Sequence, residues 1–114
     1  KQSGFDQLLP EFMKKDSLVY GGYSAGAMAV TPSLHGAELV DDPNPIPTGY
    51  QKEIVWNGIG LVNFCLAPHY QSDHHESKAI ENTVEYYEKY KIPYKTLQDG
   101  QVIIVHNDTI KLVG

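Results

Sequence analysis

The chain has 114 residues, the length of one domain or of part of one, and its 41% apolar and 20% charged residues argue against overall disorder. A formal net charge of −5 argues against a nucleic-acid partner or an anionic membrane surface. The single cysteine, Cys65, excludes an internal disulfide and favours a cytoplasmic location, and no apolar stretch approaches the roughly 20 residues of a membrane span.

The first third of the chain predicts a helix, a buried strand and a second helix. Residues 1–3 and Gly4 are typical of the last turn of a helix with its glycine C-cap, so we expect the chain to begin inside a larger domain. With Asp6 as N-cap, apolar residues at helical spacing predict a helix to about residue 15. A short apolar run predicts a buried strand at residues 18–20, and small apolar side chains predict a buried helix at residues 25–30.

The rest of the chain alternates between short strands and one longer helix. Prolines and glycines predict a long loop over residues 31–50, a length usual for functional or mobile loops. Ser72 or Asp73 is the expected cap of a helix over about residues 75–90, whose apolar face has helical spacing. A turn is expected at residues 58–61. Strands are predicted at residues 53–56, 63–67, 94–97, 102–105 and 109–113, and the last two are expected to form a hairpin. This alternation favours an α/β domain with a mostly parallel sheet, in which Cys65 is a buried strand residue.

The segment between the first predicted strand and the second helix contains the pattern Gly-x-Ser-x-Gly, formed by Gly22, Ser24 and Gly26. In this context the pattern is typical of a nucleophile elbow, in which a strained turn lifts the serine hydroxyl out of the sheet. The glycines let strand and helix approach closely, and the N–H of Ala25 is then available to an oxyanion. The alternative is a tight turn in which Ser24 only caps the helix.

A serine hydroxyl needs a base, and His69 is the strongest candidate among the five histidines. It follows the predicted strand at residues 63–67 and Pro68. The carboxyl ends of parallel strands are where α/β sheets collect their active sites. The alternative is a surface histidine at a strand end.

The other histidines predict no metal site. His74, His75 and Glu76 are neighbours on one element, and the sequence offers no third ligand at a suitable spacing. We therefore expect a solvated helix start there, and no metal or other cofactor. His35 lies in the long loop, and its two alternatives are a contact with substrate and a purely structural role. His106 is expected in the hairpin turn.

The acid that orients the histidine is less certain from sequence. Asp99 begins the Asp-Gly turn after the strand at residues 94–97, which ends at the same sheet edge as the strand before His69. Asp41, Asp42 and Glu76 are rival candidates. A plain Asp-Gly turn is the structural alternative for Asp99.

Three segments together resemble the dipeptidase E and cyanophycinase family of serine peptidases. They are Tyr-Ser-Ala-Gly-Ala at residues 23–27, Ala-Pro-His-Tyr at residues 67–70 and Leu-Gln-Asp-Gly at residues 97–100. The resemblance covers essentially all 114 residues in order and spacing. The serine segment is fairly specific for the family, the histidine segment moderately so, and the last segment is weak alone.

The resemblance implies a three-layer, mostly parallel α/β sheet of the class I glutamine amidotransferase-like type with a C-terminal β-hairpin. It implies Ser24 as nucleophile and His69 as general base. Dipeptidase E carries a glutamate at the turn where this chain has Asp99, one methylene shorter. The order serine, histidine, acid differs from the serine, acid, histidine order of α/β-hydrolases, which become the minor alternative.

Members of this family are longer than this chain, so the resemblance implies that residues 1–114 are the C-terminal half of one domain. The missing N-terminal half would hold the first strands and a glycine-rich loop that supplies the second oxyanion N–H.

Three functions follow as hypotheses. The first is a serine peptidase that hydrolyses short peptides, with an N-terminal Asp implied by the resemblance. The second is a hydrolase of another amide or ester, such as cyanophycin-like peptides. The chain contains no arginine, so a guanidinium clamp for a substrate carboxylate would come from the missing half, with Lys52 as a weaker substitute. The third is a non-catalytic fragment.

Overall fold

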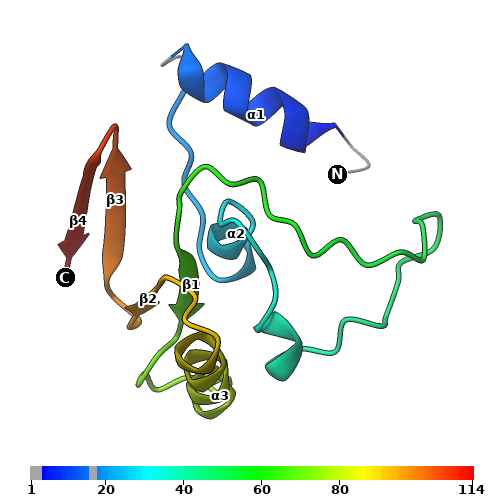
Figure 1. Ribbon diagram of the computed structural model, residues 1–114, viewed down its shortest axis with the longest axis vertical. Coiled ribbons are helices and arrows are strands. Elements are labelled where there is room, and N and C mark those ends of the chain that lie inside the picture. Colours follow the sequence, from blue (N-terminus) through cyan, green and yellow to red (C-terminus); the bar gives the residue numbers. More distant parts are fainter. Residues whose placement is uncertain (1–3, 16–17) are drawn as a thin grey trace.

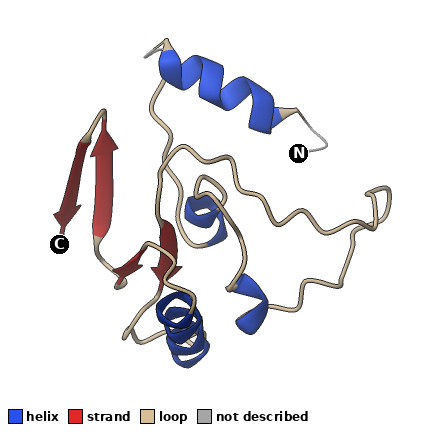
Figure 2. Cartoon of the chain, in the orientation of Figure 1, coloured by secondary structure: helices blue, strands red, loops and turns tan. Residues whose placement is uncertain are grey.

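The computed structural model describes residues 4–15 and 18–114. Its elements run along the chain in the order shown in Figure 1, and Figure 2 shows how much of the described chain is loop. They are α1 (Phe5–Lys14), α2 (Ala25–Met28), the 3-10 helix η1 (Ala37–Leu39), β1 (Cys65–Pro68), α3 (Ser77–Lys89), β2 (Tyr94–Leu97), β3 (Val102–His106) and β4 (Thr109–Val113). None of the described helices has the length and apolar character to cross a membrane.

The core is a β-α-β unit made of β1, α3 and β2. Strands β1 and β2 pair in parallel, from Cys65 opposite Tyr94 to Pro68 opposite Leu97. Every residue of β1 is buried, as its continuous apolar run requires. Helix α3 forms the crossover and buries Ile80, Thr83 and Tyr87, which repeat at helical spacing.

Two side chains of α3 tie other segments to this core. The Tyr87 hydroxyl donates to the carbonyl of Leu66 at 3.3 Å, and the Thr83 hydroxyl donates to the carbonyl of Gly36 at 2.8 Å. The second bond anchors the start of η1, and with it the long loop, against α3.

The C-terminal hairpin forms a separate two-stranded antiparallel sheet, in which β3 and β4 pair from Val102–Val113 to His106–Thr109. A two-residue turn joins the strands, and Asn107 adopts a left-handed φ of 52° there, a conformation that asparagine tolerates. The prediction of an α/β chain with a C-terminal hairpin is therefore confirmed, with one parallel and one antiparallel pair among the described residues.

Two predicted strands are wrong. Residues 18–20 are not in a strand, because none of the described strands pairs with them, and Val19 is 94% exposed. Residues 53–56 form no strand either, since pairing there is limited to one isolated bridge between Ser33 and Asn57. A strand requires a partner for its backbone groups, and an apolar run does not supply one.

Some predicted helix boundaries and caps also need correction. Helix α1 begins at Phe5 with Gly4 as its N-cap at φ 80°, so Asp6 lies in its first turn; the predicted helix end at residues 1–3 falls outside the described residues. Helix α2 ends at Met28 and buries none of its residues. Helix α3 begins at Ser77 with Glu76 as its N-cap, so neither Ser72 nor Asp73, the two predicted caps, occupies that position.

Candidate active site

Ser24 lies in a sharp turn between the extended segment 18–23 and α2. Its φ of 49° and ψ of −123° place a non-glycine residue in a strained backbone region. Gly22 makes this turn possible, since a Cβ there would lie 2.8 Å from the backbone carbon and oxygen of Gly26. The hydroxyl of Tyr20 donates to the Gly26 carbonyl at 2.6 Å and holds the two sides of the turn together.

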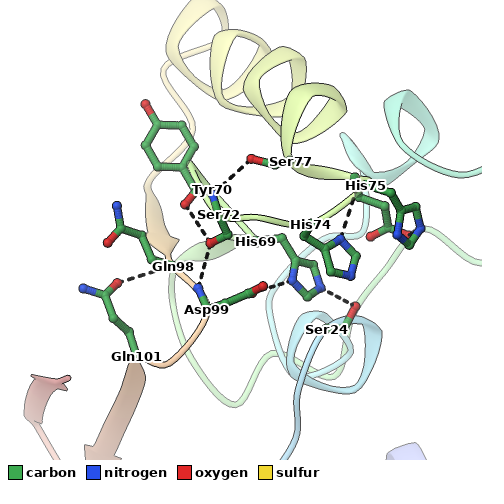
Figure 3. A network of polar contacts seen from close by, with 11 residues as sticks. Ser24, His69, Tyr70, Ser72, His74, His75, Ser77, Gln98, Asp99 and Gln101 are labelled. Atoms are coloured by element: carbon green, nitrogen blue, oxygen red, sulfur yellow. Dashed lines mark hydrogen bonds and ion pairs between the residues drawn. The ribbon is translucent and has the colours of Figure 1, made fainter.

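His69 is the first residue after β1, and its ring reaches Ser24. Its Nε2 lies 3.2 Å from the Ser24 Oγ, as Figure 3 shows. His69 also has a positive φ of 60°, so the backbone of both partners is strained. Strain at two contacting residues from separate segments is typical of a functional site.

Asp99 follows β2, and its carboxylate lies against the other side of the same ring. Its Oδ1 is 2.7 Å from the Nδ1 of His69. A carboxylate only accepts, so Nδ1 carries the proton and Nε2 is left to accept from the serine hydroxyl. The parallel pairing of β1 with β2 brings their carboxyl ends to one edge, which explains why His69 and Asp99 meet.

Backbone and side-chain bonds fix the turn that carries Asp99. The Asp99 N–H donates to the Ser72 hydroxyl at 2.8 Å, and that hydroxyl donates to the Tyr70 carbonyl at 3.2 Å. The Tyr70 N–H donates to the Leu97 carbonyl at 3.1 Å. The segment after β1 and the segment after β2 are thus bonded to each other beside His69, as Figure 3 shows.

A family model for peptidase family S51 matches residues 1–113. The chain belongs to peptidase family S51. The predicted resemblance to the dipeptidase E and cyanophycinase family is confirmed, and the family is one of serine peptidases. No curated protein matches the sequence.

In this S51 chain, Ala25 directly follows the serine and is the first residue of α2. The N–H groups of the first helical turn have no partner inside the helix. The Ala25 N–H is therefore available at the position where the sequence predicts an oxyanion donor.

His74 stacks on His69, a contact that the sequence did not suggest. The ring centroids are 3.7 Å apart and the planes differ by 8°. The backbone N–H of Glu76 donates to the Nδ1 of His74 at 3.2 Å, which is possible only while that nitrogen is unprotonated. The contact forms in the turns and bends that lie between β1 and α3, and the His74 ring consequently covers one face of the His69 ring.

The stacking of His74 on His69 also brings together three side chains of the kinds that bind metal ions. His69, His74 and Glu76 each offer a ligand atom, all within 4.8 Å of one another, and His69 supplies the third group that the sequence lacked. However, the two rings lie in nearly parallel planes, so their lone pairs do not converge on one point. Both Nδ1 atoms are already hydrogen-bonded. We therefore assign no metal to these residues.

The remaining candidates lie outside this chain of contacts. The carboxylate of Asp42 accepts from the Asn44 backbone and side chain at 3.0 and 2.7 Å. His35 stacks on Trp56 at 4.4 Å, and His106 is exposed at the end of β3. The structure therefore does not bring these three side chains to His69.

Three further residues that the sequence analysis considered make no contact with His69. Lys52 is exposed just after the long loop, and Asp41 lines a cavity that also touches Ser24. Cys65 is 3% exposed, and its burial raises the pKa of the thiol, which makes it a poor nucleophile. The prediction that Cys65 is a buried strand residue is confirmed.

Proposed function

We propose that Ser24, His69 and Asp99 are the catalytic residues of a serine-type peptidase that hydrolyses short peptides. The observation that carries the proposal is the continuous contact from Asp99 Oδ1 to His69 Nδ1, at 2.7 Å, and from His69 Nε2 to Ser24 Oγ, at 3.2 Å. Both distances are within the range expected for a nucleophile, its base and the group that orients the base. Membership of family S51 supports the same chemistry.

The reaction proceeds through an acyl-enzyme. The Ser24 oxygen attacks the peptide carbonyl carbon while its proton passes to Nε2 of His69. When the tetrahedral intermediate collapses, the C–N bond breaks and His69 returns that proton to the leaving amine. A water molecule then attacks the acyl-enzyme with His69 as base, and its hydrolysis releases the carboxylic acid and restores the serine hydroxyl. Asp99 keeps the proton on Nδ1 and stabilises the imidazolium that forms in each half of the reaction.

The Ala25 N–H is the proposed donor to the oxyanion, at the start of α2. One such donor is typically worth about 2.7–4 kcal/mol in the transition state. We also propose that residues 1–114 are the C-terminal half of a three-layer domain of the glutamine amidotransferase-like type. The N-terminal half would then supply the second donor.

The test is peptide turnover by the full-length protein. Ser24→Ala is expected to lower kcat by a factor of about 10⁶, as removal of a triad serine does elsewhere. Ser33→Ala is the matched control, because its hydroxyl lies in the long loop and accepts from the backbone N–H of His35. Retained turnover in Ser24→Ala, or no turnover of any short peptide by the wild type, would refute the proposal.

A further inference from the structure

Three imidazole rings form a column that runs from the proposed base to the surface (Figure 3). His74 lies in the middle, with its ring centroid 3.7 Å from that of His69 and 4.4 Å from that of His75. The side chain of His69 is 16% exposed, whereas that of His75 is 82% exposed. The proposed mechanism uses only the first of these rings, although the second covers it.

The middle ring makes a backbone contact that depends on its protonation. The Nδ1 of His74 accepts from the Glu76 N–H at 3.2 Å, so the proton of the neutral ring is on Nε2. A second proton would have to go to Nδ1, where it would face the Glu76 N–H as donor against donor, and the hydrogen bond would be lost. Protonation of His74 therefore changes both its charge and its contact with the backbone.

The charge of His74 decides whether its ring supports or opposes the base. His69 takes up the Ser24 proton during the reaction, and a neutral aromatic face beside the resulting imidazolium is favourable. Two unit charges about 4 Å apart, in contrast, shift an equilibrium by about fivefold in bulk water and by about 10³-fold at the effective dielectric constant of a protein surface. We propose that His74 is a positioning residue that supports His69 while it is neutral, and that protonation of His74 switches the site off.

Acidic side chains from several segments favour the uptake of one proton by the two stacked rings. A carboxylate oxygen of Glu76 lies within 4.8 Å of a ring nitrogen of His69 and of His74. The acidic side chains beside Ser24 and the rings are Asp99 after β2, Asp41 after η1, and Asp73 and Glu76 before α3. Their negative charges attract a first proton, whereas repulsion between the rings opposes a second. The two rings therefore compete for one proton, as coupled groups do.

The size of the effect follows from this competition. If the rings share one proton equally, the fraction of molecules with both rings neutral at acid pH is about half of that in a variant that cannot be protonated at position 74. The difference is larger if His74 takes up the proton more readily than His69. This inference rests on the proposed roles of Ser24 and His69, and it adds the condition under which the two residues act.

The first experiment measures the rate at which a fluorophosphonate labels Ser24 in the full-length protein between about pH 5 and 8, where imidazoles titrate. His74→Phe keeps an aromatic face and cannot be protonated, so its rate relative to the wild type should rise at least about twofold from the alkaline to the acid end. His74→Asn is a second variant that cannot be protonated, and its amide oxygen can replace Nδ1 as the acceptor of the Glu76 N–H. It should show the same rise.

His106→Phe is the matched control, because His106 is exposed at the end of β3, and its rate relative to the wild type should not change with pH. Relative rates that are equal at both ends of the pH range in both His74 variants would overturn the inference while Ser24 is still labelled. A wild-type Ser24 that is not labelled at any pH would refute the proposed function as well.

The second experiment follows the protonation of His69 directly. The Cε1–H signal of His69 is recorded by NMR against pH in the full-length wild type and in His74→Asn. We expect two coupled steps in the wild type, because the charge on His74 affects His69, and one step in the variant. The same single-step curve in both proteins would contradict the inference.

Discussion

The two parts of the candidate active site, the nucleophile on one side and the base with its acid on the other, are held in different ways. His69 and Asp99 follow adjacent, paired strands, and the turns that carry them are bonded to each other through Ser72 and the Tyr70–Leu97 backbone contact. Ser24 follows a segment that pairs with none of the described strands and exposes Val19 by 94% and Tyr23 by 89%.

The difference shows which parts of the fold position the base and its acid and which part positions the nucleophile. The base and acid are positioned by β1, α3 and β2, so sheet pairing and a buried core determine their distance. The nucleophile is positioned by its own turn, through the close approach of Gly22 to Gly26 and the bond from Tyr20. Substitutions in the two regions should therefore fail in different ways.

After the loss of the nucleophile itself in Ser24→Ala, the largest expected effect comes from the acid. Asp99→Asn should lower kcat by about 10⁴-fold, because an amide in place of the carboxylate favours the wrong tautomer of His69 and does not stabilise the imidazolium. Steady-state kinetics on a short peptide measure this. Asp108→Asn is the matched control, an exposed aspartate in the turn of the hairpin. A loss of less than tenfold in Asp99→Asn would show that another group orients the base.

The next effect is in the nucleophile segment. Gly22→Ala introduces a Cβ 2.8 Å from the Gly26 backbone, so the turn must open and Ser24 must move away from His69. A displacement of about 1 Å costs on the order of 100-fold in rate. Gly21→Ala is the control, since a Cβ there meets no atom within 4 Å. Equal kcat values for the two variants would contradict the role given to the turn.

Ser72→Ala tests the bonds between the two turns of the base and acid. It removes the acceptor of the Asp99 N–H, and a net loss of about 1 kcal/mol corresponds to about fivefold in kcat. As a positioning residue, Ser72 should affect kcat with little change in KM. A rise in KM with unchanged kcat would instead place Ser72 in substrate binding.

The smallest expected effect is that of the stacked imidazole. His74→Ala removes the ring that covers His69. It should lower kcat by about two- to fivefold, because the interaction of the His69 imidazolium with an aromatic ring contributes about 0.5–1 kcal/mol. His74→Phe keeps an aromatic face and should restore most of the rate. If both variants lose equally, the contact does not act through stacking.

The sequence predicted the elements whose signals are local. The apolar run of β1, the helical spacing of Ile80, Thr83 and Tyr87, and the strand Tyr94–Leu97 each specify their structure within a few residues. The segment at residues 18–20 has an equally apolar pattern, but a strand also depends on a partner elsewhere in the chain, which a local pattern does not show.

The same distinction applies to the site. Ser24, His69 and Asp99 could be selected because each follows a predicted strand and has a side chain suited to its role. Ser72 and His74 could not, because their contacts depend on the path of the turns and bends between β1 and α3. Nothing in the spacing of His74 indicates that it stacks on a histidine from the preceding strand end.

The central claim is that Ser24 is a nucleophile activated by His69. The most direct measurement is the reaction of the full-length protein with a fluorophosphonate, followed by mass mapping of the modified residue and by the rate in His69→Ala. The account predicts a single adduct on Ser24 and a rate at least 10³-fold lower in His69→Ala. An adduct on another residue, or labelling of Ser24 that does not depend on His69, would contradict it.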